Sequence, residues 1–126
     1  MKLTSIFAII IGVQFALTHI AATYFRVYFE IPWFDSVMHF FGGVVIAFFI
    51  FALRDVRVLN RKFVTSWTYW SVAVATILIS WEVFEWTMIF RIKDDFVLDT
   101  FFDLLFGILG CLLGKFIGHI MNKLEI

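Results

Sequence analysis

Long apolar runs, broken by short polar segments, are the main pattern along the chain. The runs cover residues 3–25, 33–53, 64–90 and 96–121. A helix needs about 20 apolar residues to cross the hydrocarbon core of a bilayer, so each run is long enough for one span. The short connections favour antiparallel neighbours packed in sequence order. The pattern predicts an all-α membrane protein, an antiparallel bundle of four transmembrane helices.

Composition agrees with this prediction. Of the 126 residues, 63% are hydrophobic and 21% aromatic, well above the usual apolar share of a soluble domain. The four runs use nearly all of the chain, so we expect a single transmembrane domain over residues 1–126 with an uncleaved first span. The expected partner is the lipid bilayer. No nucleic acid is expected, and a homo-oligomer is compatible with the sequence.

Basic residues gather on one side of the predicted spans. That side receives Lys2, the loop 54–62, Lys115 and Lys123. The other side receives only Arg26, Arg91 and Lys93. By the positive-inside rule we predict a multi-pass protein of the cell membrane with cytoplasmic N- and C-termini and two short external loops. Lys115 and His119 are expected to snorkel towards the cytoplasmic interface.

Ionisable residues inside the predicted spans occur in pairs at the spacing of one helix face. Spacings of three or four residues join Asp35 with His39, Glu82 with Glu85, and Asp99 with Asp103. A carboxylate in the apolar layer costs about 2.5 kcal/mol or more unless it is paired or hydrated. The pairs therefore need a specific explanation.

The depth of these residues is similar in all four predicted spans. At about 1.5 Å per residue, each span brings an ionisable side chain to a layer roughly 10 Å below the outer surface. The residues at this layer are His19, His39, Glu85 and Asp103, with Glu82 one turn deeper. We therefore predict that the helices converge on one polar cluster.

Some of these residues also have simpler explanations. Asp35 and Asp99 are near predicted helix N-termini, where a carboxylate caps free amides and interacts favourably with the helix dipole. His19 can equally well hydrogen-bond a neighbouring helix. Neither explanation applies to the three deeper carboxylates, so a functional role is favoured for Glu82, Glu85 and Asp103.

Small residues follow the polar pairs along the same helix faces. In the last span these are Gly107, Gly110, Gly114 and Gly118, and in the second span Gly42 and Gly43. Because small residues let helix backbones approach closely, we expect the second and fourth spans to pack together and to bring Asp103 to His39.

A divalent cation would neutralise such a cluster directly, because carboxylates packed together repel one another. Helical bundles build metal sites from inward Glu and His residues at these spacings. Oxygen-rich ligands with one or two imidazoles suit Mn, Fe or Zn, and also Mg where the histidine does not touch the ion. The candidate ligands are His19, Asp35, His39, Glu82, Glu85, Asp99 and Asp103.

The segments DSVMHFFGG, SWEVFEW and LDTFFDLLFGILG together resemble the D-x3-H, E-x2-E and D-x3-D-x3-G pattern of the small YjdF-like inner-membrane proteins. A more distant similarity is to VanZ-like proteins, which are linked to glycopeptide-antibiotic resistance. The resemblance covers residues 35 to 110 and implies no activity for the YjdF-like family. The positions it carries over are Asp35, His39, Glu82, Glu85, Asp99 and Asp103.

Three classes of function fit these observations. The favoured one is a metal-dependent enzyme or binder that acts on a lipid head group or lipid-linked envelope intermediate, with Glu82 or Glu85 as the general base. The second is a proton- or cation-coupled carrier, in which the same acids load and release the ion. No acidic relay leads inward from Glu82 in the sequence, which argues against a carrier. The third is a structural module whose polar network locks the helix packing.

Overall fold

The structure, a computed structural model, describes residues 2–88 and 96–124. Within these ranges the chain forms helices joined by turns, without strands. The helices are α1 (Leu3–Tyr24), α2 (Val27–Glu30), α3 (Phe34–Asp55), α4 (Arg61–Thr65), α5 (Trp67–Met88) and α6 (Phe96–Leu124). Residues 89 and 90 of the predicted third span, together with Arg91 and Lys93, lie outside the described residues.

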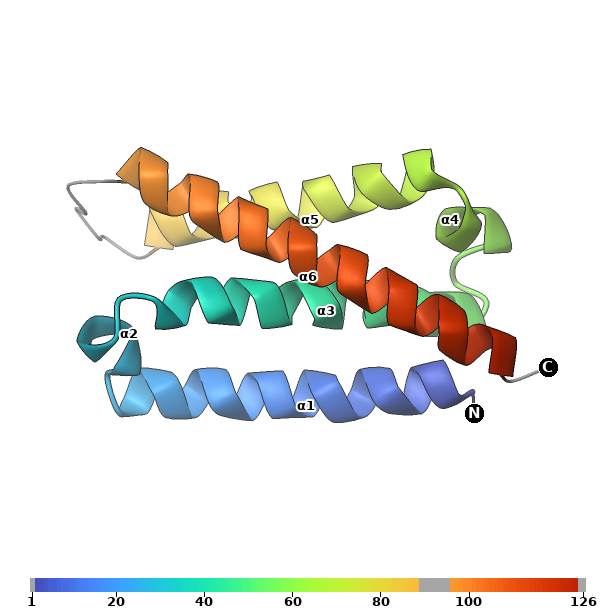
Figure 1. Cartoon of the computed structure of the whole chain (residues 1–126), viewed down its shortest axis with the longest axis horizontal. Helices are drawn as coiled ribbons and strands as arrows, with labels where there is room; N and C mark the ends of the chain where they lie inside the picture. The colour runs from blue at the N-terminus through green and yellow to red at the C-terminus, as the bar shows by residue number, and fades with distance from the viewer. Residues whose placement is uncertain (1, 89–95, 125–126) are drawn as a thin grey trace.

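The long helices α1, α3, α5 and α6 alternate in direction along the chain, and the short α2 and α4 lie at the turns (Figure 1). Three of them, α1, α3 and α6, are long and apolar enough to cross a membrane. The described residues of α5 do not reach the same hydropathy, because this helix carries Ser, Thr, Trp and Tyr residues as well as Glu82 and Glu85. The all-α class is confirmed, and a fourth span stays a prediction.

The helices begin close to three of the predicted spans, but the third predicted span includes parts of two helices. Helices α1, α3 and α6 begin within one residue of the predicted starts. The third span was predicted from residue 64, but Val64 and Thr65 belong to α4, and the extended backbone of Ser66 separates α4 from α5. Asn60 supports the separate helix, because its side chain accepts a hydrogen bond of 3.0 Å from the Lys62 amide. The prediction from the apolar run did not include this break between α4 and α5.

Helices α3 and α6 form the most extensive helix pair, and glycines line their contact. A Cβ atom on Gly43 would collide with the carbonyl oxygen of Gly107, and one on Gly110 with the carbonyl oxygen of Phe40. Such an approach of two backbones needs positions without side chains. The predicted close packing of these helices is confirmed. Gly107 faces a different neighbour: a Cβ atom added to it would lie 2.9 Å from the side chain of Leu78 on α5, and not against the α3 backbone.

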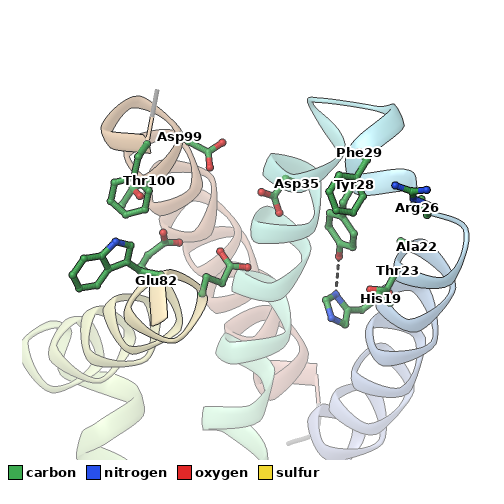
Figure 2. A pocket seen from close by; sticks show the side chains of 13 residues that line it. His19, Ala22, Thr23, Arg26, Tyr28, Phe29, Asp35, Glu82, Asp99 and Thr100 are labelled. Atoms are coloured by element: carbon green, nitrogen blue, oxygen red, sulfur yellow. Dashed lines mark hydrogen bonds between the residues drawn. The ribbon is translucent and has the colours of Figure 1, made fainter. Parts of the chain in front are cut away.

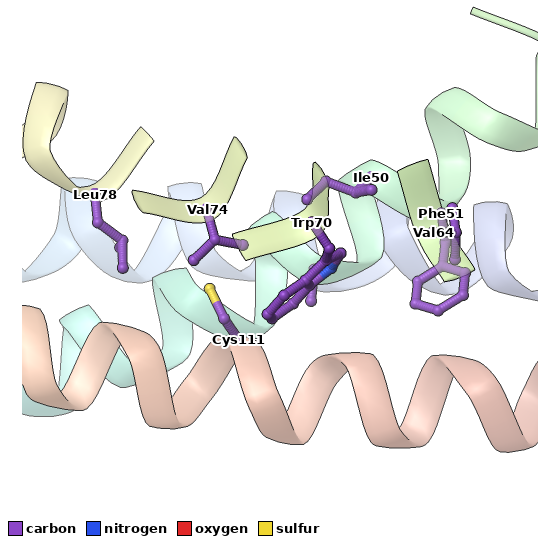
Figure 3. Close-up of a cluster of buried hydrophobic side chains, with 8 residues drawn as sticks. Ile50, Phe51, Val64, Trp70, Val74, Leu78 and Cys111 are labelled. Carbon is purple, nitrogen blue, oxygen red and sulfur yellow. The ribbon is translucent and has the colours of Figure 1, made fainter. Parts of the chain in front are cut away.

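An apolar core joins α3, α4, α5 and α6 on the side of the pair that α5 covers (Figure 3). Its members are Ala47, Ile50, Phe51, Val64, Trp70, Val74, Leu78 and Cys111. Three of them, Trp70, Val74 and Leu78, belong to α5 and pack against the α3–α6 pair. This core holds α5, with Glu82 and Glu85 near its end, against the other two helices.

Lys115 is buried between helices and does not extend to the protein surface, and its position at the cytoplasmic interface stays a prediction. Its side chain is buried, and Nζ has no hydrogen-bond partner in the described part of the chain. The ammonium lies 4.2 Å from the ring centroid of Trp67 and 4.4 Å from that of Trp70. Indole faces attract a cation, and they keep this one inside. His119, in contrast, is exposed.

A group of polar residues, the Asp55 cluster, ties the start of α1 to the end of α3. Asp55 Oδ2 accepts hydrogen bonds from the hydroxyls of Thr4 at 2.6 Å and Ser5 at 2.8 Å. Asp55 Oδ1 accepts one from Arg54 Nε at 2.9 Å, and Lys2 Nζ lies 4.0 Å away. Although the Asp55 side chain is only 3% exposed, both of its oxygens are hydrogen-bonded and its charge is neutralised.

Candidate metal centre

Ionisable side chains from three helices meet where α3 and α6 begin and α5 ends. Two come from each helix, and together they form what we call the carboxylate cluster: Asp35, His39, Glu82, Glu85, Asp99 and Asp103. The alternating helix directions bring these ends to the same side of the molecule (Figure 1). The predicted convergence of the second, third and fourth apolar segments is therefore observed.

His39 lies at the centre of the carboxylate cluster. Its Nε2 atom is 3.7 Å from Asp35 Oδ1, 3.8 Å from Glu85 Oε2 and 3.6 Å from Asp103 Oδ2. Its Nδ1 atom is 3.7 Å from Glu82 Oε1. These separations exceed the usual hydrogen-bond range of about 2.7–3.2 Å. The three Nε2 distances suit ligands of one ion, since two ligands that each bond a metal at about 2.1 Å can lie up to about 4.2 Å apart. The contact of Glu82 with Nδ1 is a separate one, because one ion cannot bond both nitrogens of a ring.

The ligand atoms form two overlapping groups. In each group every member offers one atom within 4.8 Å of the others. The first group is His39, Glu82, Glu85 and Asp103, and the second is Asp35, Asp99 and Asp103. Asp103 belongs to both groups. The residues of this site could therefore hold a metal ion.

Asp103 is a buried carboxylate with one oxygen that the described residues leave unsatisfied. Its side chain is 2% exposed, and Oδ2 faces the imidazole of His39. Its second oxygen, Oδ1, is buried without a hydrogen-bond partner among residues 2–88 and 96–124. Leaving a buried acceptor unsatisfied costs about 1–3 kcal/mol, and more for a charged group. A cation at this position would remove that cost.

A partly open cavity of about 470 Å³ adjoins the cluster (Figure 2). Asp35, Glu82, Glu85 and Asp99 form one side of its wall, and residues of α1 and α2 form the other. His39 and Asp103 do not line this cavity. The cluster thus has an accessible layer at the cavity and a deeper layer behind it.

A second cavity of about 190 Å³ continues from the site between α1, α3 and α5. Its lining is mostly apolar and includes Phe15, Ile46, Ile77 and Leu78. His39 lines this cavity, and Glu85 lines both cavities. Asp35 lines both cavities as well, so the two cavities meet at these two carboxylates.

His19 lies in the wall of both cavities but not in either ligand group. Its Nδ1 atom is 2.7 Å from the Tyr28 hydroxyl (Figure 2). This hydrogen bond connects α1 to α2 and agrees with the simpler explanation for His19. Its role as a metal ligand stays a prediction.

Arg26 and Tyr28 are cavity residues that sequence analysis did not single out. Arg26 follows the end of α1 in a left-handed conformation with φ 59°, and its guanidinium lies 5.5 Å from the ring centroid of Phe29. A residue other than glycine in this conformation is uncommon and marks a sharp helix end. Helical spacing offers no signal for such residues, because the chain reverses direction at this point.

Comparison with known proteins agrees with the membrane assignment. A family model described as Predicted membrane protein (DUF2238) matches residues 1–123. No curated protein and no solved structure matches the chain. The family match is consistent with the YjdF-like resemblance, whereas the similarity to VanZ-like proteins stays a prediction. Because the match spans nearly the whole sequence, the chain belongs to the DUF2238 family of predicted membrane proteins.

Proposed function

We propose that this protein is a multi-pass membrane enzyme that binds a divalent metal in the carboxylate cluster and acts on the head group of a lipid or lipid-linked intermediate. The observation that carries the proposal is the buried, unpartnered Oδ1 of Asp103 inside a group of converging ligand atoms. A purely structural network would be expected to satisfy such an oxygen, because unpaired buried groups are costly.

The proposed membrane arrangement has four spans, with α5 added to α1, α3 and α6. Helix α5 has 22 residues, which corresponds to about 33 Å and is enough to cross the hydrocarbon core. Trp67 and Trp86, near its two ends, are 63% and 66% exposed, as expected for aromatic residues at membrane interfaces. Lys2, Arg54 and Lys62 would then lie in or near the cytoplasm, and the carboxylate cluster would face the opposite side.

A lipid substrate is supported by the two adjoining cavities. The larger cavity offers space for a head group beside the carboxylates, with Arg26 available to contact a phosphate. The smaller, apolar cavity between α1, α3 and α5 offers a surface for part of a hydrocarbon chain. An amphiphile placed across both cavities would bring its ester linkage close to Glu85.

The position of each residue determines whether it would bind the metal or accept a proton. His39, Glu82, Glu85 and Asp103 would hold the ion, which supplies polarisation of a phosphoryl or ester oxygen and makes a bound water more acidic. The Glu85 side chain is 26% exposed and that of Glu82 only 12%. Glu85 is therefore the better placed of the two predicted general bases to accept a proton from water.

Metal analysis of the detergent-purified protein tests this proposal. After dialysis, the wild type should retain a divalent metal, and Glu82→Gln and Glu85→Gln should retain much less because each deletes a ligand charge without changing size. Glu30→Gln is the matched control, since Glu30 is an exposed carboxylate on α2. Metal-loaded wild type should also release phosphate from phosphatidic acid in mixed micelles, and Glu85→Gln should not.

A wild-type protein that takes up no divalent metal and melts identically with and without chelator would remove the metal from the proposal. The protonated network or carrier hypotheses would then be preferred. Uptake of metal without turnover of any lipid phosphoester would instead leave a metal-dependent binder.

The orientation can be tested separately by thiol labelling of intact cells. Glu30→Cys and Asn60→Cys would each be made in a Cys111→Ser background. A membrane-impermeant reagent should label the Glu30→Cys variant only. Labelling of the Asn60→Cys variant alone would mean that the carboxylate cluster faces the cytoplasm.

A further inference from the structure

We infer that the carboxylate cluster is a dinuclear site, in which the Asp103 carboxylate bridges two divalent cations. This inference rests on the proposed function, because both ions share Asp103. The second ion would be held by Asp35 and Asp99, for which the sequence offered helix capping as the simpler explanation.

The first step of the argument is the way the ligand atoms divide. His39, Glu82 and Glu85 converge with Asp103 in one group, and Asp35 and Asp99 converge with Asp103 in another. Both Asp35 and Asp99 are in the first turn of a helix, where the dipole favours an anion. The dipole alone does not explain why their oxygens also come within 4.8 Å of an Asp103 oxygen.

The second step concerns the two oxygens of Asp103. Oδ2 faces His39 at 3.6 Å and so belongs with the first group. Oδ1 is buried, and the described chain offers it no hydrogen-bond partner. A carboxylate that bridges two ions uses one oxygen for each, so a second ion accounts for the unpartnered atom.

The third step is the balance of charge. The cluster contains five carboxylates and a single imidazole. One divalent ion leaves most of the negative charge of these carboxylates uncompensated, whereas two ions compensate nearly all of it. Because excess charge is costly inside a membrane-spanning bundle, the donor set suits two cations better than one.

The position of the two groups suggests different roles for the ions. His39 and Asp103 lie behind the larger cavity, while Asp35 and Asp99 line it. Both ions would adjoin the cavity, because Glu82 and Glu85 of the first group line it as well. The first ion would have four protein ligands and the second three, which leaves the second ion more open to a substrate. Paired ions about 3.5–4 Å apart bind phosphoryl oxygens between them. This arrangement suits a phosphate ester as the ligand class.

Manganese binding tests the inference, because Mn²⁺ is both a suitable ion and a spectroscopic probe. The dialysed wild type should bind about two Mn²⁺ per chain and give the exchange-coupled electron paramagnetic resonance spectrum of a pair. Asp99→Asn should bind about one Mn²⁺ and give the spectrum of an isolated ion. Asp103→Asn should weaken both sites at least about tenfold, and Glu30→Gln should behave like the wild type.

The outcomes separate this inference from the proposed function. Wild type with one uncoupled Mn²⁺, and Asp99→Asn with unchanged binding, would overturn the dinuclear site and leave the single-ion proposal in place. Two ions without exchange coupling would overturn the Asp103 bridge. No Mn²⁺ uptake by the wild type would overturn both proposals. If a variant fails to fold, the number of Mn²⁺ ions per wild-type chain and the exchange coupling between them still test the dinuclear site.

Discussion

Asp55 and Asp103 are almost equally buried, with side chains 3% and 2% exposed, but their surroundings are opposite in kind. Two hydroxyls, a guanidinium and a nearby ammonium surround Asp55. Asp103 is surrounded by an imidazole and other acids, and one of its oxygens has no partner in the described ranges. Asp55 is the last residue of α3, and Asp103 is in the first third of α6. Because α3 and α6 run in the same direction (Figure 1), the two aspartates lie toward opposite sides of the molecule.

This difference shows that burial alone does not identify a functional carboxylate in a membrane protein. The Asp55 cluster resembles a complete salt bridge with added hydrogen bonds, so it has a sufficient role in joining α1 to α3. The carboxylate cluster gathers like charges that would be expected to repel one another without a counter-ion. The contrast can be tested by treating the two aspartates in parallel.

The largest effect is expected from Asp55→Ala. Removing one partner of a buried ion pair costs about 3–5 kcal/mol, and here it would also leave Arg54, Thr4 and Ser5 without their acceptor. Unfolding of metal-free protein in detergent should show this loss. Asp103→Asn, measured in the same way, should keep or increase stability because it removes an uncompensated charge. Equal destabilisation by the two substitutions would contradict the contrast.

The second-largest effect concerns stabilisation by bound metal. Here the substitution of Asp103 should have the larger effect and that of Asp55 the smaller. At a free metal concentration 100 times Kd, binding stabilises the folded state by about 2.7 kcal/mol. Chelation should therefore lower the melting temperature of the wild type, and lower that of Asp103→Asn by much less. A conservative Asp55→Asn variant should keep the chelator response. If its response were lost as well, the two clusters would be coupled rather than independent.

A smaller effect is expected where α6 meets α3. In Gly110→Ala the new methyl group would collide with the Phe40 carbonyl, and such overpacking typically costs about 1–3 kcal/mol. Metal affinity should fall too, because Asp103 would shift relative to His39, whereas the Asp55 cluster should remain intact. Gly12→Ala is the control, since nothing lies within 4 Å of its added Cβ. Equal stability of both variants would mean that the contact is looser than the structure indicates.

The smallest effect concerns Lys115, a buried charge held by rings. Trp67→Leu should destabilise the protein by about 0.5–1 kcal/mol, because it removes one of the two indole faces. The same substitution in a Lys115→Met background should cost less, and the difference measures the cation–π contribution. Additive effects in this double-mutant cycle would show that the ring packs against the lysine without attracting its charge.

Much of this molecule could be predicted from sequence, because an apolar solvent restricts what a chain can do. Backbone groups must be satisfied within each helix, so long apolar runs predict long helices, and α1, α3 and α6 begin close to where these runs begin. Helical spacing and a common depth brought His39 together with Glu82 and Asp103, as observed. These predictions depend on local periodicity, which a single sequence records directly.

The failures concern partners that are far apart in the chain. Ser5 and Asp55 are separated by 50 residues, and no local pattern links them. The indole partners of Lys115 are on another helix, so no local pattern predicted that its side chain is buried against them. The break at Ser66 was missed because hydrophobic and aromatic residues continue beyond it, with Phe63 and Val64 before and Trp67 and Trp70 after. In each case tertiary contact, and not periodicity, determines the conformation or the exposure.

Asp103 has a further consequence for how the protein is made. Chains are synthesised from the N-terminus at about 5–20 residues per second, and α6 is the last helix that the structure describes. His39, Glu82 and Glu85 are therefore translated before the residue that both ligand groups share. A nascent chain cannot assemble either group until α6 has emerged and packed its glycines against α3. If the cluster binds metal as proposed, no ion can acquire its complete set of ligands before α6 is made.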